Sequence, residues 1–193
     1  MPSFTKEAIL KAFLHIAAKK PIEKITVRDI VDECGVNRNT FYYYFQDIYA
    51  VLEELGRQGV GALPAELGFG EAVEMLYRKW LTVCGEHPRA LRNLTISLGA
   101  DGFGRYFAPV LNEVLIRGLM HDAVGASLPT ELQRLAVDFA RHALIGICMD
   151  TVREKGAAYD AAQLRRTAES MLTGLGYQES TGRVKAASGG GIV

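Results

Sequence analysis

Apolar residues recur along this chain at intervals of three and four positions, which is the spacing of an α-helix. Over residues 5–19 one apolar stripe runs through Ile9, Phe13 and Ile16, with the lysines lying off it. Stripes of the same period return over residues 71–86, 88–99, 104–124, 129–155 and 160–175. No stretch alternates between apolar and polar residues for long enough to build a sheet. The pattern therefore predicts an all-α protein.

The segment between positions 26 and 47 contains several residues that are typical of helix starts and helix ends. Thr26 and Asp29 stand three positions apart, as in a capping box, and predict the start of a helix. Gly35 stands where the end of that helix favours a left-handed residue. Asn37 and Asp47 can each cap a further helix. Two short helices joined by a turn that contains glycine, and preceded by another helix, predict a helix-turn-helix.

The second of these short helices carries the most informative pattern. Phe41 and Phe45 are one turn apart and define its inner face. The opposite side and its flanks offer amide, hydroxyl and phenol groups, from Asn39, Thr40, Tyr42 and Tyr43. A helix of this size fits the major groove of DNA, where such groups can contact bases and phosphates. The alternative is an ordinary helical hairpin within a larger bundle.

A run of glycines over residues 56–70 weakens helix and predicts a boundary or hinge. We therefore expect a helix-turn-helix DNA-binding domain over residues 1–58. A helical ligand-sensing and dimerisation bundle is expected over residues 59–177. Residues 178–193 are rich in Gly, Ser and Ala and lack a stripe, which predicts a flexible tail.

Charge by itself does not favour nucleic acid. The chain of 193 residues has 22 basic and 22 acidic side chains, and residues 1–59 hold eight of each. DNA binding must therefore depend on where the charges lie. Three widely spaced cysteines favour reduced thiols over a disulfide framework. No apolar stretch approaches the roughly 20 residues of a membrane span, and no signal peptide is evident, so we expect a cytoplasmic protein.

The segment 25–49 resembles the N-terminal helix-turn-helix of the tetracycline-repressor (TetR) family of bacterial regulators. The matching features are Thr26, Asp29, Ile30, Gly35, Val36, Thr40, Phe41, Tyr42, Phe45 and Asp47. The run from Phe41 to Tyr49 further resembles a subgroup that includes regulators of dihydroxyacetone kinase genes. The resemblance covers about 50 residues and implies a DNA-binding transcriptional regulator.

The resemblance also implies which residues face a double-stranded DNA operator. They are Thr26, Arg28, Arg38, Asn39, Thr40, Tyr42, Tyr43 and Tyr44. Arg28, Arg38 and Asn39 are expected to reach bases, and the others mainly phosphates. Two positions depart from the family pattern. Tyr44 replaces the usual histidine. Ile48 replaces a lysine that can reach a phosphate, and the loss of this cation should weaken DNA binding and reduce its dependence on salt.

Two late stripes are compatible with a dimer interface. One runs from Leu132 to Ile147 and the other from Leu164 to Leu175. In the family that this chain resembles, the last two long helices usually join their copies in a two-fold homodimer, which reads a pseudo-palindromic operator. The alternative is that both stripes are buried only within their own subunit.

A small-molecule effector site is expected among the middle helices of the predicted bundle, where apolar side chains mix with a few polar ones. The candidates are Tyr77, Trp80, Phe103, Tyr106, Phe107, Met120, His121, Phe139 and His142. Plain core packing is the alternative for all nine. Binding of the effector is expected to change the distance between the two helix-turn-helix domains of a dimer.

Enzyme motifs are missing from the sequence. The four histidines form no HxxH or HExxH unit, no cysteine pair has metal-ligand spacing, and no GxSxG is present. We therefore expect no enzyme, no metal and no cofactor. We expect a DNA-binding transcriptional repressor whose affinity for its operator is controlled by a small molecule. The alternative is a co-regulator of the same fold that binds DNA weakly and acts through a protein partner.

Overall fold

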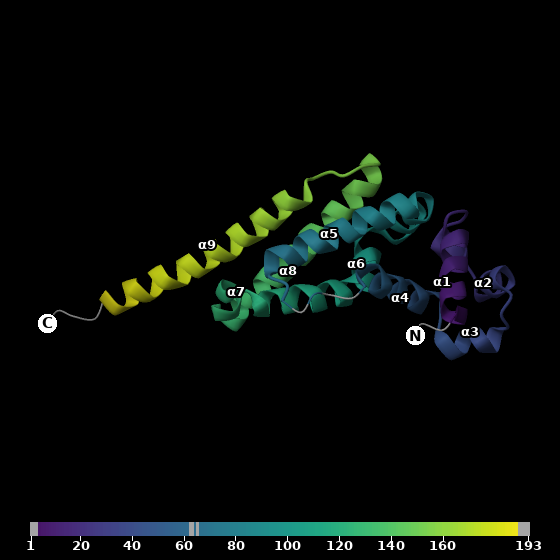
Figure 1. Ribbon diagram of the computed structural model, residues 1–193, viewed down its shortest axis with the longest axis horizontal. Helices are drawn as coiled ribbons and strands as arrows, with labels where there is room; N and C mark the ends of the chain where they lie inside the picture. Colours follow the sequence, from purple (N-terminus) through teal and green to yellow (C-terminus); the bar gives the residue numbers. More distant parts are fainter. Residues whose placement is uncertain (1–3, 62–63, 65, 189–193) are drawn as a thin grey trace. The chain divides into compact units, whose positions relative to one another are not determined.

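The computed structural model describes the backbone of residues 4–61, 64 and 66–188, and side chains of these residues through Gly176. Its regular elements are all helices, so the predicted all-α fold is confirmed over the described residues (Figure 1). They are α1 (Phe4–Ala17), the 3₁₀ helix η1 (Ile22–Lys24), α2 (Val27–Cys34), α3 (Arg38–Tyr44), α4 (Ile48–Val60), α5 (Phe69–Glu86), α6 (Pro88–His121), α7 (Ala123–Ser127), α8 (Thr130–Glu154) and α9 (Ala161–Ser188). None of these helices is long and apolar enough to cross a membrane.

Side-chain caps begin the three short helices α2, α3 and α4, as predicted. The Thr26 hydroxyl accepts from the Asp29 N–H (3.2 Å), and the Asp29 carboxylate accepts from the Thr26 N–H (2.8 Å), which completes the capping box. Asn37 Oδ1 accepts from the Thr40 N–H (2.8 Å). Asp47 accepts from two first-turn amides of α4. Gly35 ends α2 with φ 71°, a left-handed value that suits glycine.

Two compact units make up the chain. Unit 1 comprises residues 1–62, 78–110 and 145–158, and unit 2 comprises residues 63–77, 111–144 and 159–193. Helices α5, α6 and α8 each contribute to both units. This division follows compactness, whereas the predicted boundaries at residues 58 and 177 concern function and stay a prediction.

The first part of α6 belongs to the same buried cluster as the helix-turn-helix. Ala90, Leu91 and Leu94 are buried in one hydrophobic cluster with residues of α1, and this cluster extends to Phe41 of α3 and Leu52 of α4. The Asn93 side-chain amide donates to the carbonyl of Ala17 at the end of α1 (2.9 Å). Within unit 1, α6 is therefore part of the structure that supports α3.

Helix boundaries differ from the predicted ones in three places. Helix α4 passes through Gly56 and Gly59, because packing against neighbouring helices outweighs the low helix propensity of glycine. It ends at Val60, with Gly61 (φ 67°) as its C-cap. Helix α6 kinks at Gly99 (φ 61°), near the predicted break. Residues 178–188 are helical rather than a flexible tail, in keeping with their Glu, Arg, Lys and Ala content. Residues 189–193 lie outside the described residues.

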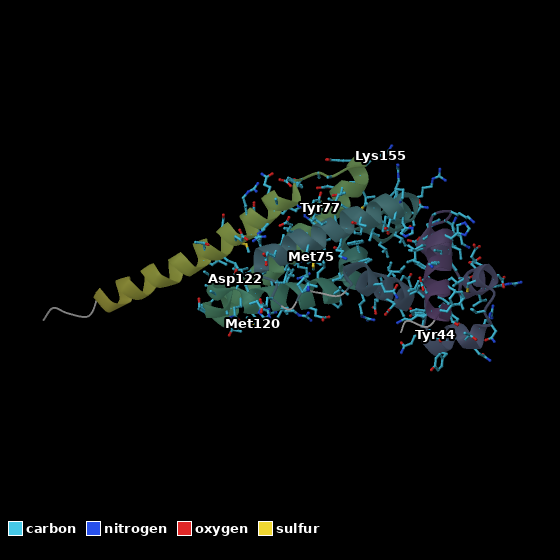
Figure 2. All side chains as sticks on the ribbon, viewed as in Figure 1. Tyr44, Met75, Tyr77, Met120, Asp122 and Lys155 are labelled. Atoms are coloured by element: carbon cyan, nitrogen blue, oxygen red, sulfur yellow. The ribbon has the colours of Figure 1, made fainter. Side chains whose placement is uncertain are left out.

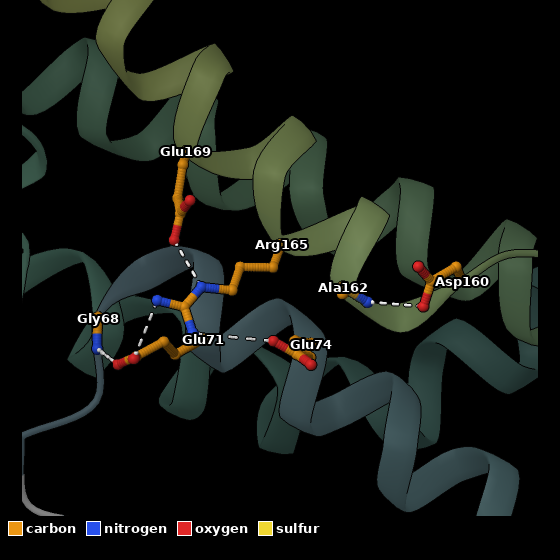
Figure 3. Close-up of polar contacts among 7 residues, drawn as sticks. All are labelled: Gly68, Glu71, Glu74, Asp160, Ala162, Arg165 and Glu169. Carbon is orange, nitrogen blue, oxygen red and sulfur yellow. Dashed lines mark hydrogen bonds and ion pairs between the residues drawn. The ribbon is translucent and has the colours of Figure 1, made fainter.

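In unit 2, helix α9 is held to α5 by one arginine (Figure 3). The Arg165 guanidinium contacts Glu71 (3.2 Å) and Glu74 (3.9 Å) of α5, and Glu169 (2.8 Å) of its own helix. The backbones also approach closely, since a Cβ at Gly70 would lie 3.0 Å from the Arg165 carbonyl oxygen. The α5–α9 contact thus combines a charged cluster with a glycine.

Candidate nucleic-acid interface

Helix α3 turns one side inward and one side outward. Phe41 and the following Phe45 are buried in the cluster of unit 1. Tyr42 and Tyr43 are exposed over 55% and 82% of their surfaces, and Arg38 is exposed as well. The N-cap residue Asn37 helps to fix the rotation of α3, because this cap and the inward phenylalanines together decide which side chains reach solvent.

The eight predicted DNA-facing residues are all at least partly exposed, but they differ in how far their polar groups are already used. The Thr26 hydroxyl donates to Asp29 (2.7 Å) and the Thr40 hydroxyl donates to Asn37 (3.0 Å). Arg28 lies 3.5 Å from Asp32. The two hydroxyls would have to exchange a present hydrogen bond for one to DNA, whereas the Arg28 guanidinium has further N–H donors.

Tyr44, labelled in Figure 2, is half-buried. Its ring meets that of Tyr43 edge to face at 4.9 Å. Because of this contact, Tyr44 helps to orient the exposed ring of Tyr43.

Four of the eight predicted residues form no side-chain hydrogen bond or ion pair within the described part of the chain. We call the set Arg38, Asn39, Tyr42 and Tyr43 the reading face. Among the described residues, no hydrogen-bond or ion-pair partner is found for the polar groups of this face. A guanidinium, an amide and two phenols are thus available on one short helix. Asn and Arg are the residue types that recognise adenine and guanine edges, and phenols suit phosphate oxygens.

Several acidic side chains near the helix-turn-helix contact a basic neighbour. Lys6 pairs with Glu54 (2.7 Å) and Lys20 with Asp29 (2.7 Å), and His15 contacts Glu33. The Lys20 hydrogen bond, helped by those from Thr26, lowers the pKa of Asp29 to about 2. Helix α3 itself carries no acid and one cation, Arg38. A neutral domain thus still presents a positive reading face.

Ile48 occupies the first position of α4, where the family resemblance expects lysine. Its side chain is half-buried and packs against the cluster of unit 1. The position therefore supports the fold and supplies no cation beside the reading face.

The nine predicted effector residues lie in both units. In unit 1, Trp80 and Phe107 both contact Phe103, with ring centroids 5.3 and 4.3 Å apart. Tyr106 stacks on Tyr49 (5.1 Å), and burial is the main cause of its raised pKa. The Trp80 indole N–H donates to the Cys148 carbonyl (3.1 Å). These aromatics form a packed cluster that joins α5, α6 and α8.

The remaining five candidates are in unit 2. Tyr77 is buried, and its hydroxyl oxygen accepts from the Tyr159 N–H (3.4 Å). Met120, labelled in Figure 2, is exposed, as is Phe139. His121 and His142 are exposed too. None of the nine lines the pocket described next, so their role in binding an effector stays a prediction.

Sequence reasoning missed a pocket of about 450 Å³ in unit 1. It lies where the end of α5, the start of α6 and the end of α8 meet, and three basic side chains line it, from Arg89, Arg92 and Lys155. The only sign of this pocket in the sequence is that basic residues stand beside two predicted turns, one near residue 88 and one near residue 156. Nothing in the sequence indicated that turns more than 60 residues apart come together.

The helix-turn-helix geometry agrees with a comparison against family models. Residues 9–55 match the model of the bacterial regulatory proteins of the tetR family. Over these residues the chain is similar to the N-terminal domain of that family. The matched segment contains α2 and α3 with their caps, and it includes the reading face. No curated protein matches the chain.

Three solved structures share the fold over most of the chain. The dihydroxyacetone kinase operon activator DhaS is 17% identical, covering 89% of this chain and 95% of its own, with a TM-score of 0.60. A TetR transcriptional regulator from Rhodococcus sp. RHA1 is 17% identical, covering 87% and 96%, with a TM-score of 0.56. The fatty acid degradation regulator FadR from Bacillus halodurans is 19% identical, covering 89% and 96%, with a TM-score of 0.53. At these identities the likeness concerns the fold.

Proposed function

We propose that this protein is a transcriptional repressor that binds a pseudo-palindromic operator in the bacterial cytoplasm as a homodimer, and that a small molecule changes its affinity for that operator. The observation that carries the proposal is the reading face, whose polar groups are exposed and unpartnered within a tetR-family domain. An exposed polar surface of this kind suits a duplex, which offers base edges and phosphate oxygens.

Placed in the major groove, α3 would make two kinds of contact, to base edges and to phosphates. Arg38 and Asn39 are in the first turn, which usually enters the groove deepest, and would contact base edges. Tyr42 and Tyr43 stand one turn further and would hold phosphates. Base contacts would determine sequence preference and phosphate contacts overall affinity.

Support for a homodimer comes from α8. Leu135 and Phe139 are exposed over 54% and 62% of their surfaces, with the small and exposed Ala143 one turn further. Their stripe neighbours Ala136 and Ala140 are buried within unit 2. The predicted stripe thus divides into an inner row and an outer row. An outer apolar row on a helix suits association with a second copy.

The proposal is tested by titrating DNA from the region upstream of the protein's own gene with purified protein, at several salt concentrations. We expect a specific complex whose affinity falls steeply with salt, because phosphate contacts release counterions. The double variant Arg38→Ala/Asn39→Ala should lose this complex. Arg105→Ala, which removes an exposed cation from α6, should keep it.

A second candidate function is supported by the scarcity of cations. With Ile48 packed inward, Arg38 is the single cation of α3. A co-regulator that binds DNA weakly and acts through a protein partner fits this charge. The absence of any salt-sensitive complex across candidate operators would favour this function over the first.

A further inference from the structure

The pocket in unit 1 combines an apolar wall with a positive rim, and we call it the cationic pocket. Leu81 of α5, Leu91 of α6 and Val152 of α8 supply apolar surface. The volume of about 450 Å³ falls in the range of small-molecule sites. Burial raises the pKa of the lining Cys84 thiol to about 11, so this thiol is neutral and brings no negative charge to the wall.

The basic side chains at the rim are not used in ion pairs within the described part of the chain. Arg89, Arg92 and Lys155 have no ion-pair partner among the described residues, and none of the described lining residues is acidic. Cations elsewhere in the fold are commonly paired, as Arg153 is with Asp150 at the same end of α8. The first turn of α6 adds the positive end of its dipole. Three free cations around apolar surface are complementary to an anion that carries an apolar body.

Lys155 stands in a backbone conformation that favours glycine. Its φ is 58°, a left-handed value, and it is found immediately after the end of α8 (Figure 2). The Gly156 N–H donates to the Thr151 carbonyl (3.2 Å), which closes a helix-ending turn. Glycine at position 155 would avoid the steric cost of that turn. A strained lysine at the mouth of a pocket points to a role for its ammonium group there.

The pocket is also joined to the helices that carry the reading face. Leu91 lines the pocket and belongs to the buried cluster that contains Phe13 of α1. Two positions further along α6, Asn93 holds the end of α1 through the Ala17 carbonyl. A shift of the first turns of α6 would therefore reach α1 through packed side chains and one hydrogen bond.

We propose that the cationic pocket binds a small organic anion with an apolar body, and that this anion is an effector of operator binding. The effector role rests on the proposed function, whereas binding of the anion does not. A carboxylate and a phosphate monoester share the required chemistry, and the test separates them.

Binding is measured by calorimetry on the full-length protein with three probes that share one tail, namely octanoate, octyl phosphate and 1-octanol. We expect at least one anion to bind saturably at one site per chain, and 1-octanol to bind at least about tenfold more weakly, which is the size of one charge-assisted contact. Equal affinity for all three probes, or no saturable binding of either anion, would overturn the proposal.

Lys155→Gly is the decisive variant because its effects on binding and on folding have opposite signs. The affinity for the anion should fall about tenfold or more, while Tm should rise by about 2–4 °C as the left-handed strain is relieved. Lys155→Arg should retain binding, and Arg153→Gln, which removes a cation from the same helix end, should match the wild type. Unchanged affinity in Lys155→Gly would refute a role for this pocket.

The effector role is tested by repeating the operator titration with a saturating concentration of the anion that binds. The Kd for DNA should change at least about threefold in the wild type and stay constant in Lys155→Gly. An unchanged Kd in the wild type would show binding without an effector role. If the anion-free protein binds no operator, the proposed function and the effector role both fail, while the calorimetry still decides whether the pocket binds the anion.

Discussion

The short helices α2 to α4 and the long helices α5, α6 and α9 are held in different ways. Each short helix begins with a side-chain cap, from Thr26, Asn37 or Asp47. The long helices approach one another at glycines such as Gly70 and Gly118, within unit 2. Short helices cannot bury enough surface to fix their own ends, so local hydrogen bonds must do it. Helix α9 also begins with a cap, from Asp160 to the Ala162 N–H (3.1 Å), but the long helices obtain much of their stability from contacts with partners distant in sequence.

The difference between the short and the long helices can be tested first at a glycine where two long helices pack against each other. A Cβ at Gly118 of α6 would lie 2.9 Å from the Ala72 Cβ and 3.2 Å from the Phe69 Cα of α5. Because backbone has to move, we expect Gly118→Ala to destabilise the protein by about 1–3 kcal/mol in urea unfolding. The matched control is Gly104→Ala on the same helix, where the nearest atom is at 3.5 Å. This control should be neutral or stabilise by about 0.5–1 kcal/mol, and equal losses in both variants would contradict close packing as the cause.

On the short helices the corresponding test concerns the reading face. Asn39→Ala should alter sequence preference, costing about 1–3 kcal/mol of discrimination at the base pair that Asn39 contacts. Tyr42→Ala should weaken binding to every DNA sequence by about the same factor, because it would remove a phosphate contact. Affinities for an operator and a set of single-base variants measure both effects. Uniform losses for both variants would remove the distinction between base and phosphate contacts within α3.

The cap of α3 separates stability from DNA binding. Asn37→Ala removes the hydrogen bond to the Thr40 N–H and should cost about 1 kcal/mol, lowering Tm by about 2–4 °C. Asn37→Asp keeps an oxygen acceptor and should preserve Tm. Since it places a negative charge beside the reading face, Asn37→Asp should nevertheless weaken operator binding. Thermal unfolding and DNA titration of both variants check this, and a large fall of Tm in Asn37→Asp would count against the cap.

The smallest effect concerns pH and the capping box of α2. The pKa of Asp29 is lowered from 3.8 to about 2, first by Lys20 and then by Thr26. A lowered carboxyl pKa gives stability that is present above about pH 4 and is lost as the pH falls from 4 to 2. Lys20→Gln should therefore flatten the fall of the urea midpoint in this window. Lys19→Gln, which removes an exposed neighbouring cation, should leave that fall unchanged.

The same contrast explains how much the sequence could predict. The caps at Thr26, Asn37 and Asp47, and the left-handed Gly35, were predictable because each signal lies within four residues of its partner. The inward Phe41 and outward Tyr43 followed from helical periodicity. The fold class and the exposure of α3 were therefore within reach of sequence reasoning.

Contacts between distant segments were out of reach. Gly56 belongs to the glycine run that predicts a helix break, yet in the structure it is the place where α4 meets the Phe107 ring of α6. The cationic pocket brings the α5–α6 turn to the end of α8, more than 60 residues away. Residues 178–188 carried strong helix formers among the glycine and serine that suggested a tail. Each case depends on which surface a residue meets, and periodicity carries no information about that.

Trp80 is the sole tryptophan of the chain, and its indole N–H donates to the Cys148 carbonyl within unit 1. Its fluorescence emission therefore reports on α5 and α8 in unit 1, whereas far-ultraviolet circular dichroism averages over helices of both units. Comparing the two optical signals during denaturation measures whether the units melt as one cooperative body or in sequence. The protein thus carries an intrinsic probe that needs no added label.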